Sequence, residues 1–219
     1  MCNLYRVTTN QEAIRRIARV MQDCTGNLPS LPGIYPDYAA PIVRNGEGGE
    51  SELAMARWGM PSPAFVLKGR NSDPGVTNVR NTTSPHWRRW LGSEHRCLVP
   101  LTAFAEPARD ADGKSRPVWF AQSEDRPLVF FAGIECRGWK SVRKVKDGET
   151  TDDLFAFLTT EPNREVAAIH PKAMPVILTT EAERETWLTA PWSEAVDLQR
   201  PLPDGALQIV ARGPTPDGA

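Results

Sequence analysis

Short apolar runs separated by turn residues recur along the whole chain, and this pattern limits the fold more than any other feature. Strands are expected at 2–8, 41–44, 53–58, 95–100, 117–121, 128–135, 154–159, 174–178 and 207–212. Asp112-Gly113 and Asp147-Gly148 favour tight turns between them. Because strands follow one another instead of alternating regularly with helices, we predict a single α+β domain. We expect mostly antiparallel strands that curl into a barrel-like core, together with a few short helices. A sandwich of two sheets is the alternative.

Helix signals are few and short. Thr9 and Glu12 form a capping box for a helix over about 10–23, and Thr180 and Glu183 form another for a helix ending near residue 189. Shorter helices are expected at 84–91, where a proline occupies the first helical position, at 163–169 and at 193–199. No composition shift marks a boundary, so we expect one domain over 1–212 and a tail without regular structure over 213–219.

Composition excludes several classes of protein. The chain has 219 residues, 40% of them hydrophobic and 24% charged, which is typical of a soluble globular domain. It shows neither a signal-peptide pattern nor an apolar run approaching ~18 residues, so we expect a cytoplasmic protein without a membrane partner. Its cysteines and histidines are scattered: Cys2, Cys24, Cys97, Cys136, His86, His95 and His170. We therefore predict no disulfide framework, no metal and no cofactor.

Charge is unevenly distributed although the formal net charge is only −1. One basic group lies at 137–146, and a second, which includes Arg88 and Arg89, lies beside Trp87 and Trp90. Cations interleaved with aromatic rings are what a groove for single-stranded nucleic acid needs. The alternative is that the two tryptophans pack into the core from one face of a short helix.

Cys2 is the most informative single residue, because removal of Met1 would leave a chain that begins with cysteine. A terminal cysteine carries an amine and a thiol two carbons apart. The amine can condense with an aldehyde, and the thiol can then close a five-membered thiazolidine. The competing interpretation is a small buried apolar residue with no chemical role.

Five ordered segments accompany Cys2. They are Ala56-Arg57-Trp58-Gly59-Met60, Asn78-Val79-Arg80, Arg96–Pro100 with Phe104-Ala105-Glu106, Leu158-Thr159-Thr160, and Ile169-His170 continuing to Leu178. The residue types, order and spacing of these segments resemble those of the SRAP family of SOS response-associated peptidases. The resemblance runs from Cys2 to about residue 178. The chain departs from the common family pattern at Asn3-Leu4-Tyr5, at Pro107 and at Pro171-Lys172.

The resemblance implies a partner and a reaction. Family members cross-link themselves to abasic sites in single-stranded DNA during the DNA damage response. By resemblance, Cys2 is the nucleophile through its amine and then its thiol, Glu106 deprotonates the amine, His170 promotes sugar opening, and Asn78 contacts the opened sugar. DNA contacts are expected from Arg57, Trp58, Arg80, Arg88, Arg89 and Thr159, with a core position as the alternative for Trp58.

The resemblance also implies AP lyase activity and removal of Met1, either by the protein itself or by a housekeeping aminopeptidase. We expect a monomer that associates with the bacterial nucleoid when bound to DNA. Two other functions stay open from the residues. One is an N-terminal-nucleophile amidohydrolase, which also needs an oxyanion hole. The other is a single-strand-binding module in which Cys2 is incidental.

Overall fold

A five-stranded antiparallel sheet carries the N-terminus of the chain. The computed structural model describes residues 2–109 and 112–214. In these ranges the first sheet has the order β14-β9-β8-β1-β3. Its strands are β1 (Leu4–Val7), β3 (Leu31–Ile34), β8 (Ala103–Arg109), β9 (Ser115–Ala121) and β14 (Gln208–Arg212). β1 lies between β3 and β8, so the start of the chain is held from both sides.

The second sheet closes on itself. Its strands are β2 (Gln22–Asp23), β4 (Ala39–Asn45), β5 (Ser51–Trp58), β6 (Asn78–Val79), β7 (Arg96–Leu101), β10 (Val129–Val142), β11 (Glu149–Thr160), β12 (Met174–Pro175) and β13 (Ile177–Leu178). β5, β4, β7, β10 and β11 pair in this order, and β11 pairs back onto β5. These five strands therefore form a closed barrel, and β11–β5 is its parallel pair. β6 adds to β11 in the same parallel sense.

Aromatic side chains join the two sheets. Tyr5 of β1 makes edge contacts with Trp58, Phe131 and Phe157, whose ring centroids lie 5.1, 5.5 and 6.1 Å away. Phe131 and Phe157 stack on each other at 4.2 Å. Ring pairs at these distances and angles stabilise a core beyond the area they bury. The first strand is thereby packed against the barrel.

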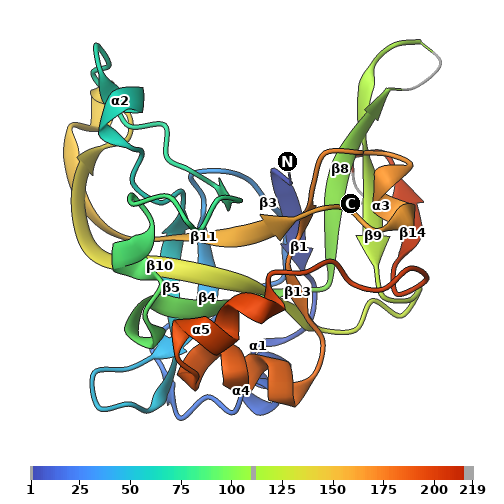
Figure 1. The fold of residues 1–219 in the computed structure, drawn as a ribbon, viewed down its shortest axis with the longest axis horizontal. Coiled ribbons are helices and arrows are strands. Elements are labelled where there is room, and N and C mark those ends of the chain that lie inside the picture. The colour runs from blue at the N-terminus through green and yellow to red at the C-terminus, as the bar shows by residue number, and fades with distance from the viewer. Residues whose placement is uncertain (1, 110–111, 215–219) are drawn as a thin grey trace.

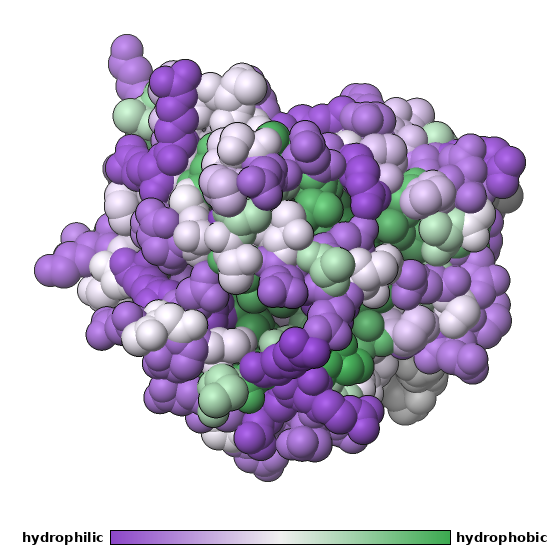
Figure 2. Space-filling model, turned by 60° about the horizontal axis from the view of Figure 1, so that its bottom comes forward, coloured by the Kyte–Doolittle hydropathy of each residue, from purple (hydrophilic) through white to green (hydrophobic). Residues whose placement is uncertain are grey.

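The helices are short. They are α1 (Gln11–Ile17), α2 (Ala64–Leu67), α3 (Arg164–Ala167), α4 (Glu181–Thr189) and α5 (Trp192–Ala195), with the 3₁₀ turns η1 (Arg88–Trp90), η2 (Ser93–His95), η3 (Val145–Asp147) and η4 (Val196–Leu198). α1, α4 and α5 gather at one end of the molecule (Figure 1). The face seen in Figure 2 is mainly hydrophilic, with the most strongly apolar residues gathered in small recesses. Among the described residues no helix is long and apolar enough to cross a membrane.

The predicted fold class is confirmed, namely a single α+β domain of mostly antiparallel strands with a barrel core and short helices. The capping box at Thr180 and Glu183 is also confirmed. The first helix was predicted too long and with the wrong cap. Asn10, and not Thr9, accepts the hydrogen bond from the Ala13 amide. Arg19 has a φ of 52°, which ends the helical path, and the chain continues into β2 beside β5.

Two further predictions were corrected. The helix expected at 84–91 is only the 3₁₀ turn η1, although its two tryptophans are buried as the core alternative required. β10 and β11 extend well beyond the predicted 128–135 and 154–159, because they pair as one long hairpin. Of the predicted tail, residues 215–219 lie outside the described residues.

Candidate active site around Cys2

Cys2 is buried where the chain enters β1. Its side chain is 1% exposed, and its thiol lies 3.5 Å from the Leu4 carbonyl oxygen. The Cys2 carbonyl oxygen accepts a hydrogen bond of 2.8 Å from Nδ2 of Asn78. Burial, reinforced by the charge of Glu106, raises the pKa of the Cys2 thiol well above its usual value. The thiol is therefore neutral at pH 7.

Glu106 comes beside Cys2 through the register of β1 and β8. Leu4 pairs with Ala105 in these antiparallel strands, so the residue after Ala105 faces the residues that precede Leu4. The Glu106 side chain is 0% exposed. Burial raises the pKa of its carboxyl from 4.5 to about 7. A carboxyl with this pKa can accept and return a proton near neutrality.

His170 lies beside Glu106, just after α3. Its backbone amide donates to the Val166 carbonyl oxygen at 2.7 Å. Its Nδ1 lies 3.0 Å from the Ala173 carbonyl oxygen and 3.9 Å from Oε2 of Glu106. Since a carbonyl oxygen can only accept, this geometry assigns the neutral imidazole proton to Nδ1 and leaves Nε2 as an acceptor. The ring is only partly buried, so it remains accessible at the edge of the site.

Asn78 and Thr159 offer polar atoms near the same place. β6 runs parallel to β11, with Asn78 paired to Phe157, so Asn78 and Thr159 lie on neighbouring strands. Both side chains are buried. Asn78 Oδ1 and Thr159 Oγ1 have no hydrogen-bond partner among the described residues. Buried polar atoms are usually satisfied, so these two are available to a ligand.

Sequence analysis missed Gln199, which follows η4. Its Nε2 donates to the carbonyl oxygens of Arg80 at 2.8 Å and Thr159 at 3.1 Å. Its Oε1 accepts from the Thr82 hydroxyl at 3.0 Å. Gln199 therefore ties the segment that follows Asn78 to the end of β11. No local motif marks this residue, because its role depends on partners far away in the sequence.

The predicted DNA-contacting cations differ in their surroundings. Arg80 is exposed at the surface, with one guanidinium nitrogen 3.4 Å from Oε2 of Glu161. Arg57 lies between Asp37 and Asp152, at 3.4 and 3.5 Å. Arg80 is thus the cation more open to a phosphate.

Trp58 lies in the core and is 0% exposed. Its ring stacks with Phe157 at 5.2 Å and Phe155 at 6.4 Å, and its Nε1 donates to the Thr77 carbonyl oxygen at 3.0 Å. This placement matches the core alternative. In this structure the ring has no face open to a base, because neighbouring rings enclose it, and its contact with Tyr5 supports the strand that follows Cys2.

Arg88 and Arg89 lie on η1 and are exposed. The Arg89 guanidinium lies 4.7 Å over the Trp90 ring. Arg88 lines a hollow with Thr82 and Trp192, separate from the pocket that contains Glu106. The structure therefore does not bring these two cations into the cluster around Cys2.

The basic group at 137–146 is partly neutralised. Arg137 pairs with the buried Glu135 at 2.9 Å, and Arg143 pairs with Asp37 at 3.2 Å. Within residues 2–109 and 112–214, no group of three or more His, Cys, Asp or Glu side chains is arranged to hold a metal ion.

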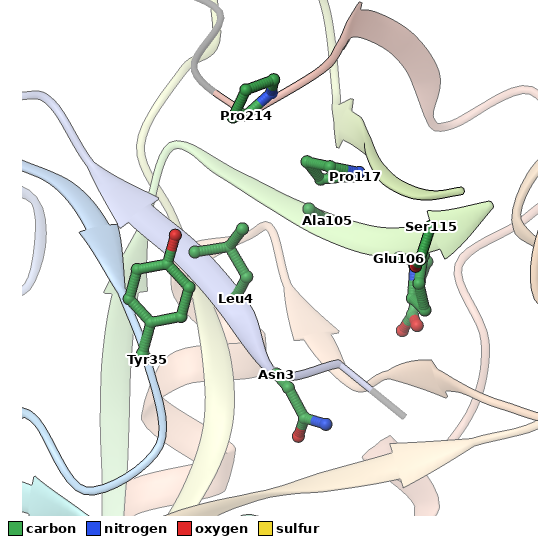
Figure 3. Close-up of a pocket in the computed structure, with 9 residues that line it drawn as sticks. Asn3, Leu4, Tyr35, Ala105, Glu106, Ser115, Pro117 and Pro214 are labelled. Atoms are coloured by element: carbon green, nitrogen blue, oxygen red, sulfur yellow. The ribbon is translucent and has the colours of Figure 1, made fainter. Parts of the chain in front are cut away.

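A pocket of about 380 Å³ opens beside the cluster. Leu4 and Ala105, a cross-strand pair, belong to its lining. Figure 3 shows the Glu106 side chain reaching from β8 toward the side on which the chain enters β1, and Tyr35 beyond Leu4. The cluster of Cys2, Asn78, Glu106 and His170 therefore adjoins a hollow large enough for a small organic group.

Comparisons with known proteins agree with this fold. A Bordetella bronchiseptica protein of known structure has 23% identity and a TM-score of 0.71, covering 97% of this chain and 98% of its own. A Bacteroides thetaiotaomicron protein has 22% identity and a TM-score of 0.69, covering 94% and 90%. A phage-related protein from Bordetella bronchiseptica has 19% identity and a TM-score of 0.67, covering 98% and 94%. No curated protein matches the chain.

The fold and the site thus define an α+β barrel protein with a buried second-position cysteine beside a carboxyl, an amide and an imidazole. The family model described as SOS response associated peptidase (SRAP) matches residues 1–211. The chain therefore belongs to the SRAP family, as the resemblance predicted. Membership associates the protein with the SOS response to DNA damage.

Proposed function

We propose that the protein binds single-stranded DNA at abasic sites and links itself covalently to the opened sugar through Cys2. The observation that carries this proposal is the convergence of Cys2, Asn78, Glu106 and His170, which come from four separate parts of the chain. Each supplies a group that the reaction needs. Family membership supports the association with DNA damage.

The reaction begins after loss of Met1, when the Cys2 amine is free. The amine attacks the C1′ aldehyde of the opened deoxyribose, and loss of one water gives an imine. The thiol sulfur then bonds to the imine carbon, and its proton passes to the nitrogen. The product is a thiazolidine, and no oxidant or reductant is consumed.

The shifted pKa values support this order of events. A neutral amine is the nucleophile of the first step, and Glu106, with a pKa of about 7, can take the proton that the amine releases. His170 can take a proton on Nε2 and then give it to the ring oxygen of the sugar or to the hydroxyl that leaves as water. The Cys2 thiol is neutral at pH 7, so it is held back until the imine has formed. An amidohydrolase would instead use the thiol as the first nucleophile, which a raised pKa disfavours.

Three further properties belong to the same proposal. An imine that is not captured by the thiol can undergo β-elimination, which gives AP lyase activity. Release of Met1 is either autoproteolytic or performed by an aminopeptidase. The protein acts as a monomer in the cytoplasm and at the nucleoid.

An aldehyde-bearing oligonucleotide tests the proposal against its alternatives. We expect incubation with single-stranded abasic DNA to give an adduct that survives denaturing electrophoresis. Mass spectrometry should place the sugar remnant on Cys2 of a chain lacking Met1. An amidohydrolase or a plain single-strand-binding module would form no such adduct, and that result would reject the proposal.

A further inference from the structure

Two tyrosines are exposed beside the candidate active site, in the segment between β3 and β4. Tyr35 is 45% exposed and Tyr38 is 56% exposed. Their rings contact each other edge to face, with centroids 5.6 Å apart. Neither the proposed covalent chemistry nor the packing of the core requires an exposed aromatic pair at this position.

Tyr35 forms one wall of the pocket that contains Glu106. Leu4 and Ala105 line it with apolar surface, and Glu106 and Pro107 also belong to its lining. Figure 3 shows Tyr35 and Glu106 on opposite sides of Leu4. The pocket volume of about 380 Å³ is in the range that takes small planar ligands. A flat group in this pocket would lie next to the cluster around Cys2.

The Tyr35 ring is held in place. A Cβ atom on Gly33 would lie 3.3 Å from Cε2 of Tyr35 and 3.7 Å from Cδ1 of Leu4, so the glycine lets the ring rest against β3. The Asp37 amide donates to the Trp58 carbonyl oxygen at 2.8 Å, which ties the tyrosine segment to β5. A ring that is already ordered loses little conformational entropy when a ligand stacks on it.

Cations lie close to this segment. The Asp37 carboxylate pairs with Arg57 at 3.4 Å, Arg143 at 3.2 Å and Lys144 at 3.2 Å. Arg57 also pairs with Asp152. The three cations therefore face only two carboxylates, those of Asp37 and Asp152, and one positive charge is in excess. An aromatic face next to positive charge is the combination that binds a base and its phosphate in single-stranded DNA.

We propose that Tyr35 is a stacking platform for the nucleobase that flanks the abasic nucleotide. The assignment rests on the proposed function. Asn3 and Leu4, the residues that follow Cys2, line the pocket, so a nucleotide next to a sugar held at Cys2 is within reach of it. The base lies between Tyr35 and Pro107, over Leu4 and Ala105. Tyr38 supports the ring from its edge. The platform orders the strand so that the sugar next to the base meets Cys2.

The test uses a single-stranded oligonucleotide with a tetrahydrofuran abasic analogue, which has no aldehyde, and 2-aminopurine on its 5′ or its 3′ side. Stacking on Tyr35 should quench 2-aminopurine fluorescence on one of the two sides. We expect Tyr35→Ala to abolish this quenching and to weaken binding about tenfold. Tyr35→Phe keeps the ring and should retain both. Phe65→Ala, which removes an exposed ring outside this pocket, is the matched control and should behave like wild type.

The proposal fails if the wild-type protein quenches neither oligonucleotide, or if Tyr35→Ala quenches and binds like wild type. Equal losses of quenching and affinity in Tyr35→Ala and Phe65→Ala would also overturn it, because they would indicate that DNA adheres non-specifically to exposed rings. The tetrahydrofuran cannot form an imine, so these readouts do not depend on adduct chemistry. A protein that quenches this probe but never cross-links to a true abasic site would reject the proposed reaction and leave the platform standing.

Discussion

Nδ2 of Asn78 donates a hydrogen bond of 2.8 Å to the carbonyl oxygen of Cys2. This contact ties the start of the chain to β6, which is itself paired with β11. The second residue of most proteins is free to move, and here it is anchored from a strand that Arg80 directly follows. Orientation of a nucleophile can lower a reaction barrier by several kcal/mol, so under the proposed reaction we expect this bond to affect the rate.

Asn78→Ala should slow adduct formation at saturating DNA by about tenfold, since loss of one such bond is worth about 1 kcal/mol or slightly more. The rate is measured by single-turnover cross-linking to abasic single-stranded DNA. Asn81→Ala is the matched control, because it removes a nearby exposed asparagine whose side-chain oxygen accepts hydrogen bonds from Thr83 and leaves both partners of the Asn78 amide in place. An unchanged rate in Asn78→Ala would show that this anchor is not used in the reaction.

Glu106→Gln should slow adduct formation by about 10²–10⁴, the usual contribution of a positioned general base. The wild-type rate should rise as the pH increases through about 7, where the Glu106 carboxyl loses its proton. The glutamine variant should lack this inflection and keep only the one due to the Cys2 amine. A pH–rate profile for each protein provides the comparison. Identical profiles would remove Glu106 from proton transfer.

The same carboxyl makes folding stability depend on pH. Its pKa is about 7 in the folded protein and ordinarily 4.5, so the folded state holds the proton more tightly. The free energy of unfolding therefore falls as the pH rises from about 4.5 to 7, by an amount on the order of 3 kcal/mol. We expect Glu106→Gln to have a higher Tm than wild type at pH 8 and little or no gain at pH 4. Thermal melts at both pH values check this, and a lower Tm for the variant at pH 8 would contradict it.

Gln199→Leu should weaken DNA binding several-fold, because Gln199 holds the carbonyl oxygens of Arg80 and Thr159 together. Gln199→Glu should be at least as harmful, since its carboxylate would face those two oxygens. When Gln199→Leu is combined with Arg80→Ala, the double variant should bind DNA about as weakly as Arg80→Ala alone. Both changes act through the same Arg80 guanidinium, so their effects on affinity are not additive. The coupling is measured by titrating single-stranded DNA into the wild type, Gln199→Leu, Arg80→Ala and the double variant. Fully additive losses would show that Gln199 does not act by positioning Arg80.

Two variants at the terminus separate the amine from the thiol. Cys2→Ser keeps the amine and should form an imine that borohydride traps, but no stable thiazolidine. A one-residue extension before Cys2 that processing cannot remove turns the amine into an amide and should abolish the adduct. Denaturing gels with and without borohydride distinguish the two outcomes. Wild-type cross-linking by the extended protein would refute the aminothiol mechanism.

Of the two helix caps predicted from short sequence motifs, one was correct and one was wrong, because Asn10 and not Thr9 caps the first helix. The capping box at Thr180 and Glu183 lies within one helical turn, and it formed as predicted. Most strand runs were found at their predicted positions, because alternation with a period of two is a local property. β3 and β8 were not predicted, and the full lengths of β10 and β11 were underestimated. The first helix was misjudged because a single residue, Arg19, leaves helical geometry while the apolar pattern continues past it.

The sequence by itself therefore determined the family and most of the strands, and it singled out Cys2, Asn78, Glu106 and His170 as candidate site residues. Only the tertiary structure decided which of them meet. The parallel pairing of β5 with β11 closes the barrel across about half of the chain, and it buries Trp58. Register between β1 and β8 buries Glu106 beside Cys2 and so raises its pKa. Strand partners and burial depend on contacts between distant residues, and periodicity along the chain carries no information about them.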